Sequence, residues 1–146
     1  MNGSVRIYIS KKDRSIYLLK AYVTKIGYWN SMGYLIPINR ELLKNNVLSC
    51  LEDSISAYQE EVEDVDPFKA SPYKTWNKFF RYHDYISIRC DSKKKIYSIS
   101  MNERDEKTHS YGSSLPNCEF TLTETEFDER FDEIMDFLIS KVEMIK

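Results

Sequence analysis

Apolar residues along this chain follow the same order of patterns twice. Each pass begins with two short segments in which apolar and polar residues alternate, continues through a loop to a third apolar segment, and ends in a stretch with helical spacing. Alternation with a period of two is typical of strands with one buried face, whereas apolar residues three or four apart are typical of a helix packed on a core. The pattern predicts an α+β fold.

The first pass covers residues 4–58, and its last element is a helix from about Arg40 to Tyr58. Its predicted strands are Val5–Ile9, Ile16–Val23 and Tyr34–Pro37, with a hairpin turn at Lys11–Ser15. Asn39 is the candidate N-cap of the helix, and the loop Gly27–Gly33 is expected to be irregular. The stripe of the helix predicted to face the core is Leu43, Val47, Leu51 and Ile55.

The second pass covers residues 84–142 and ends in a helix from about Thr125 to Val142. Its predicted strands are Tyr85–Cys90, Ile96–Met101 and Phe120–Leu122, and Asp105–Asn117 is expected to be an irregular loop. Thr123 with Glu126 three residues later forms a predicted capping box. The buried stripe of this helix is Phe127, Phe131, Ile134 and Leu138.

Together these elements predict one domain, residues 1–146, with an antiparallel sheet of about five or six strands and two long helices packed on it. An acidic loop and a short helix within residues 59–83 join the halves, and Trp76 and Phe80 are expected to pack on the sheet. The pair Ile16–Tyr17 recurs as Ile96–Tyr97. This recurrence suggests an internal duplication, although hairpins followed by helices are common and the element order does not require one.

Three cysteines, an odd number without a CxxC pair, argue against a disulfide framework and a zinc site. Cys50 and Cys90 are expected to be small core residues. The start of the chain lacks the apolar core of a signal peptide, and no apolar run approaches the roughly 20 residues of a membrane span. We therefore expect a cytoplasmic protein that does not bind membranes.

Charge is segregated along the chain despite a net charge of −2. Residues 52–66 hold no Lys or Arg, and their acids are Glu52, Asp53, Glu60, Glu61, Glu63, Asp64 and Asp66. Basic residues gather instead in the two hairpin turns and between Lys69 and Arg81. Such an acidic field suits a cationic partner and steers its approach.

No catalytic or cofactor-binding motif is present. The two histidines, His83 and His109, lie outside any metal-ligand spacing, and no phosphate-binding or nucleophile motif occurs. His109 and Asp105 could form an acid-base cluster, but charged loops of this kind are expected without function. We therefore expect no enzyme activity, no metal and no cofactor.

Nucleic-acid binding is the main alternative, because Lys, Arg and aromatic residues interleave in Tyr73–Tyr82 and single strands stack on exposed rings. A sequence pI near 5.8 argues against it, since phosphate binding favours a basic footprint. Trp76, Phe79 and Phe80 are more typical of a core than of a stacking platform. We expect no nucleic-acid partner.

The second half resembles the contact-dependent growth inhibition immunity protein family. The similarity lies in the order of its strands, the charged loop Asn102–Lys107 and a final helix with an acidic start, and the strand Tyr34–Pro37 feeding a helix is similar as well. The chain departs from the family where Met101, Arg104 and Tyr111 replace the expected Pro, His and Trp. The resemblance implies a protein that binds the C-terminal toxin domain, often a nuclease, of a contact-delivered effector.

In such a family the expected complex has one toxin and one immunity protein, and a toxin β-hairpin can add to the immunity sheet. The acidic faces would complement the basic cleft of a nuclease. The toxin, its activity and the free oligomeric state are left open. The candidate toxin-binding residues are Glu60, Glu61, Glu63, Asp64, Asp66, Tyr28, Trp29, Arg104, Asp105 and Tyr111.

Overall fold

The computed structural model describes residues 2–145 as a six-stranded antiparallel sheet with helices, which confirms the predicted α+β class. The sheet order is β3-β2-β1-β4-β5-β6. The strands are β1 (Asn2–Ser10), β2 (Ile16–Val23), β3 (Trp29–Ile38), β4 (His83–Asp91), β5 (Ile96–Asp105) and β6 (Ser110–Thr123). The helices are the 3-10 turn η1 (Arg40–Leu42), α1 (Leu43–Ser56), α2 (Trp76–Arg81) and α3 (Glu124–Ser140).

The two halves of the chain meet at the centre of the sheet, where β1 pairs with β4. Val5 lies opposite Ile88 and Ile7 lies opposite Ile86, so the apolar residues of both halves share one face. Each half adds its second and third strands outward from this pair and then its long helix. The order agrees with the sequence pattern, while an internal duplication stays a prediction.

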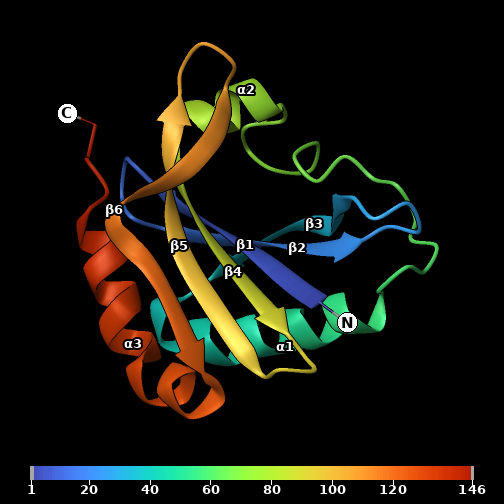
Figure 1. Ribbon diagram of the computed structural model, residues 1–146. Helices are drawn as coiled ribbons and strands as arrows, with labels where there is room; N and C mark the ends of the chain where they lie inside the picture. Colours follow the sequence, from blue (N-terminus) through green and yellow to red (C-terminus); the bar gives the residue numbers. More distant parts are fainter. Residues whose placement is uncertain (1, 146) are drawn as a thin grey trace.

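Both long helices cover the same face of the sheet (Figure 1), and one core joins them. Leu43, Val47 and Leu51 of α1 pack on β1 and β2, and Phe131 and Leu138 of α3 belong to the same buried cluster. Arg40 of η1 and Lys44 at the start of α1 form ion pairs with α3. Truncation of a fully buried ring such as Phe131 would cost about 3 to 5 kcal/mol.

The opposite face of the sheet carries α2 and a cluster of aromatic rings. Phe79 and Phe80 are 0% and 1% exposed, and the Trp76 ring lies 6.2 Å from that of Tyr8 on β1. The predicted packing of Trp76 and Phe80 is therefore confirmed. α2 begins at Trp76, because Thr75 accepts a hydrogen bond from the backbone N–H of Lys78 and acts as the N-cap of the helix.

Two segments predicted to be irregular are strands in the structure. β3 begins at Trp29, and β6 begins at Ser110, since pairing with β2 and β5 satisfies their backbone groups. Within the second segment, residues 106–109 form a turn, and the register between β5 and β6 shifts twice, between Ser100 and Asn102 and between Asn102 and Arg104. Ser114 pairs with Asn102 and Glu119 with Ser100, so residues 115–118 bulge out of β6.

Of the two predicted helix N-caps, the structure confirms Thr123 but not Asn39. Thr123 accepts from the Glu126 N–H at 3.2 Å and Glu126 accepts from the Thr123 N–H at 3.0 Å, so the capping box is confirmed. The prediction for Asn39 is wrong: its side chain caps nothing, because the chain enters α1 through η1 and Leu42 occupies the N-cap position. Along residues 2–145, no helix is both long and apolar enough to span a bilayer.

Candidate partner-binding surface

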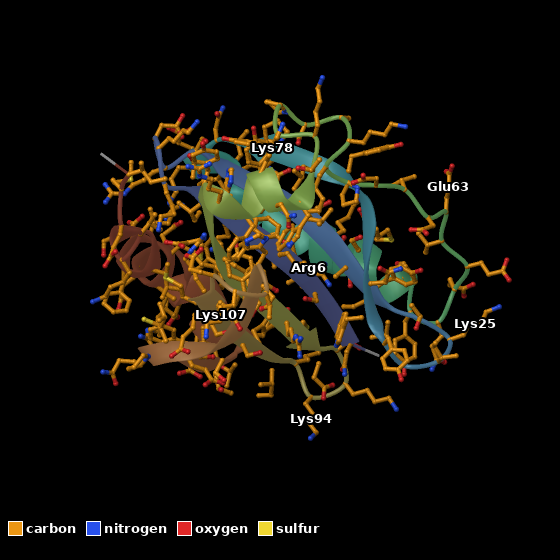
Figure 2. All side chains as sticks on the ribbon, turned by 90° about the horizontal axis from the view of Figure 1, so that it is seen from above. Arg6, Lys25, Glu63, Lys78, Lys94 and Lys107 are labelled. Atoms are coloured by element: carbon orange, nitrogen blue, oxygen red, sulfur yellow. The ribbon has the colours of Figure 1, made fainter. Side chains whose placement is uncertain are left out.

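The acidic segment that follows α1 lies beside the turn between β2 and β3. Gln59 adopts a φ of 57° and donates from its backbone N–H to the carbonyl oxygen of Val23 at 2.7 Å, which holds the chain against the end of β2. Lys25 Nζ in the turn then lies 3.4 Å from Glu61 Oε1. Figure 2 shows Lys25 and Glu63 projecting at the same edge of the molecule.

All five predicted acids of this segment are exposed: Glu60, Glu61, Glu63, Asp64 and Asp66. Within residues 2–145, only Glu61 of these five forms an ion pair. Asp66 accepts from the Phe68 N–H at 2.9 Å and so also shapes the local turn. The segment therefore presents negative charge that the protein itself leaves largely unneutralised.

The acidic face of α3 differs, because basic residues of η1 and α1 neutralise part of it. Arg40 bonds Asp132 and Asp136 at 3.1 and 2.8 Å, and Lys44 lies 2.7 Å from Asp128. These pairs tie the two helices together at the surface, where each pair contributes at most about 1 kcal/mol. Part of the acidic face of α3 is thus neutralised within the protein, whereas among the described residues four of the five acids of residues 60–66 form no ion pair.

Exposed apolar side chains lie next to these acids, at the tip of the β2–β3 turn. Tyr28 is 70% exposed and Ile26 is 78% exposed, while Gly27 between them has a φ of 86° that favours glycine. Trp29 is half-buried, with the Arg89 guanidinium 5.2 Å from its ring. We call Ile26, Tyr28, Trp29 and the five acids of residues 60–66 the acid-aromatic surface.

Ile26 was missed from sequence because a lone apolar residue in a polar turn carries no periodic signal. Its exposure is the signal that the structure adds. Apolar anchors ringed by charge are typical of protein interfaces, where a few buried side chains carry most of the binding energy. The acid-aromatic surface has this composition, with acids as the rim.

The other three predicted residues, Arg104, Asp105 and Tyr111, lie at the opposite end of the sheet. Strand register places the β5–β6 turn beside the β1–β2 turn, whereas the β2–β3 turn lies beside the start of β1. Figure 1 shows the β5–β6 hairpin rising beside α2, far from the β2–β3 turn. The structure therefore divides the ten predicted residues between two ends.

These three residues also have internal roles. Arg104 donates to the Phe80 carbonyl at 2.8 Å and packs on the Phe80 ring at 4.2 Å. Asp105 accepts from the N–H groups of Lys107 and Thr108, which lowers the pKa of its carboxyl. The Tyr111 hydroxyl donates to the His83 carbonyl at 2.5 Å, and burial raises the pKa of Tyr111. Their contact with a partner stays a prediction.

Neither histidine takes part in a metal cluster. Among the described residues, no group of three or more His, Cys, Asp or Glu side chains could hold a metal ion. His109 is exposed, and its Nδ1 lies 3.0 Å from Asn77 Oδ1. The Asp105 carboxylate instead accepts a hydrogen bond from the Lys107 N–H within the turn. His83 is fully buried, and burial lowers its pKa to about 4.

The two edge strands differ in how open they are. The outer edge of β3 is partly covered, because the Leu35 N–H donates to the Pro67 carbonyl at 3.4 Å. Within residues 2–145, β6 pairs only with β5. Pro116 and Asn117, which has a φ of 59°, interrupt its free edge at the bulge. A cavity of about 350 Å³ lined by Phe120, Ile134 and Phe137 adjoins this edge.

Comparison with known proteins yields structural neighbours but no sequence family. No family model matches the sequence, and no curated protein matches it. A protein of unknown function from Neisseria meningitidis has a TM-score of 0.62 at 13% identity, covering 97% of this chain and 95% of its own. A chain of the CdiA-CT/CdiI toxin and immunity complex from Yersinia pseudotuberculosis has a TM-score of 0.57 at 12% identity. The match covers 96% of this chain and 97% of that one. Both likenesses establish the fold.

Proposed function

We propose that this chain is an immunity protein. It binds the C-terminal toxin domain of a cognate contact-dependent growth inhibition effector and neutralises it in a one-to-one complex, without catalysis of its own. The observation that carries the proposal is the near full-length likeness to a chain of the Yersinia pseudotuberculosis toxin and immunity complex. The acid-aromatic surface supports it, because such a surface fits a basic protein partner.

A nuclease is the toxin class that suits this surface best. A nuclease must present a cationic cleft to phosphate, and residues 60–66 offer exposed, largely unpaired carboxylates. Tyr28 and Ile26 would then supply the desolvated anchors at the centre of the contact. In this arrangement the acids mainly raise the association rate, and the apolar side chains mainly slow dissociation.

Strand addition at β6 is the second element of the proposal. The Cys118–Thr123 part of β6 has a free outer edge beside the cavity of Phe120, Ile134 and Phe137. An extended toxin segment could pair there through its main chain and place an alternate apolar side chain in the cavity. The bulge at Pro116 would limit the length of the added strand.

The direct test applies where the reading frame immediately upstream encodes a very large secreted protein, and it uses the C-terminal domain of that protein. Co-expression should protect cells from that domain, and the purified proteins should elute as a one-to-one complex. Absence of both protection and complex would reject the function.

Charge reversal then tests the surface. Glu60→Lys, Glu61→Lys and Glu63→Lys combined should slow association about tenfold at low salt and weaken its salt dependence. The matched control, Glu41→Lys, Glu129→Lys and Glu143→Lys, changes the net charge equally at exposed sites elsewhere. Equal effects in both variants would reject the acid-aromatic surface while leaving the function standing.

A further inference from the structure

A ridge of cations occupies the end of the molecule opposite the acid-aromatic surface. Its members come from the β1–β2 turn, the chain before α2 and the outer side of α2. All are exposed, and they are Lys12, Arg14, Lys74, Lys78 and Arg81, here called the basic ridge. Figure 2 shows Lys78 on α2 well apart from Glu63 on the acidic segment.

Tyr82 joins the two parts of the basic ridge. Lys12 Nζ lies 3.9 Å from the centre of the Tyr82 ring, and the Arg81 guanidinium lies 5.6 Å from the same ring. The Lys11 N–H donates to the Tyr82 carbonyl at 2.6 Å, which fixes the turn against the end of α2. The ring is half-buried and contacts both cations, and the Tyr73 ring lies 5.9 Å from it.

The protein leaves the positive charge of the basic ridge unpaired. Within residues 2–145, none of its five members forms an ion pair, although Lys20, Arg40 and Lys44 elsewhere do. Asp13 is the acid of the same turn, and its carboxylate accepts from the Ser15 N–H at 3.0 Å. The acids Asp84 and Glu106 are paired with Arg104. An excess of cations therefore faces solvent.

The composition of the basic ridge indicates the class of partner. A protein interface has an apolar centre, but the apolar rings beneath the ridge, Phe79 and Phe80, are buried in the aromatic cluster. Nucleic-acid interfaces are more polar and far more positive, with phosphate contacts from Lys and Arg. Proteins that bind single strands also combine a positively charged surface with aromatic rings on which the bases stack.

We propose that the basic ridge binds the phosphate backbone of a single-stranded nucleic acid, with a base against the Tyr82 ring. The net charge of −2 does not oppose this, because the largely unpaired acids of residues 60–66 lie at the other end and salt screens charges beyond about 10 Å. The binding is weak and independent of base sequence. It is additional to toxin binding and uses a different surface.

Fluorescence anisotropy with labelled twelve-residue oligo-dT and oligo-U tests the proposal in the absence of any toxin. The wild-type protein should bind at 20 mM salt, and the logarithm of its affinity should fall with the logarithm of salt with a slope of about −3.5, as five phosphate contacts to a single strand require. Lys74→Glu, Lys78→Glu and Arg81→Glu combined should weaken binding at least tenfold and flatten the slope. Tyr82→Leu should weaken it several-fold.

The matched control is Lys93→Glu, Lys94→Glu and Lys95→Glu, which changes the net charge equally in the β4–β5 turn at the other end of the sheet. This control should keep most of the affinity. The proposal is overturned if the wild type fails to bind at 20 mM salt, if both triple variants lose affinity equally, or if poly-glutamate binds as tightly as the oligonucleotides. Protection from the toxin is measured separately, so either proposal can fail alone.

Discussion

Arg104 and Tyr111 lie opposite each other on β5 and β6, and both donate a hydrogen bond to the backbone carbonyl of His83. This carbonyl belongs to the first residue of β4, directly after α2. Arg104 also reaches the Phe80 carbonyl near the end of α2. The pair therefore fastens the β5–β6 hairpin to the junction of α2 and β4.

Removal of the Tyr111 hydroxyl should weaken this junction without breaking it. Tyr111→Phe keeps the ring against Tyr85 and Phe80, and Arg104 still bonds the carbonyl, so the free energy of unfolding should fall by about 1 kcal/mol. Urea unfolding followed by circular dichroism measures this. Tyr28→Phe is the control at an exposed tyrosine and should change stability by less than about 0.5 kcal/mol. Equal losses would contradict the assigned role of the Tyr111 hydroxyl.

A buried serine of α1 bonds two strands at once. The Ser54 hydroxyl accepts from the Ser4 N–H at 2.8 Å and donates to the Ala21 carbonyl. Ser54→Ala would leave a buried donor and acceptor without partners, and we expect a loss of about 2 kcal/mol in the free energy of unfolding. Ser49→Ala, on the exposed side of α1, should leave stability within about 0.5 kcal/mol of the wild type. A Ser54→Ala variant as stable as the wild type would contradict this role of the hydroxyl.

Periodicity was sufficient to predict the sheet, the long helices and their buried faces. Val5, Ile7 and Ile9 are buried as their alternation predicts, and Phe127, Phe131, Ile134 and Leu138 lie in the core. These predictions succeed because burial of one face is what alternation and helical spacing encode. The extent of β6 could not be predicted, since Ser110–Asn117 is polar and is strand only because β5 pairs with it.

The candidate surface was predicted less well than the fold. Composition identified the acids, and the structure places Tyr28 and Trp29 beside them through the backbone bond from Gln59 to Val23. Arg104 and Tyr111 have the residue types of interface anchors, yet here they bond the His83 carbonyl. A single sequence does not distinguish these roles, because both favour a long polar side chain that can also pack.

Three hairpin turns, β1–β2, β4–β5 and β5–β6, share one backbone conformation that predicts a stabilising substitution. Arg14, Lys95 and His109 each have a φ between 51° and 58°, four residues after Ser10, Asp91 and Asp105. Lys95→Gly should stabilise the protein by up to about 1 kcal/mol, because glycine adopts this conformation without a Cβ penalty. Thermal unfolding of Lys95→Gly and of the control Lys94→Gly measures this. A gain for the control as large as that for Lys95→Gly would contradict the backbone explanation.

His83 should make the fold sensitive to mild acid. Burial lowers its pKa to about 4, and its Nδ1 lies 2.8 Å from the Phe79 carbonyl with the ring stacked on Phe79. The unfolded chain, with a histidine pKa near 6.5, binds more protons between these values. The free energy of unfolding should therefore keep its full value above about pH 6.5. It should fall by up to about 3 kcal/mol as the pH drops towards 4.

Neighbouring charges modify this dependence, and a variant isolates the contribution of His83. Asp13 favours the protonated ring, whereas Arg104 and Lys12 oppose it. Burial raises the pKa of Asp84, which acts in the opposite direction by favouring the folded state at low pH. His83→Gln keeps Asp84 and removes the imidazole, so its free energy of unfolding should vary less than that of the wild type between pH 4.5 and 7, by about 2 kcal/mol. Urea unfolding at a series of pH values measures this. If the free energies of unfolding of the two proteins change equally with pH, the acid sensitivity arises from groups other than His83.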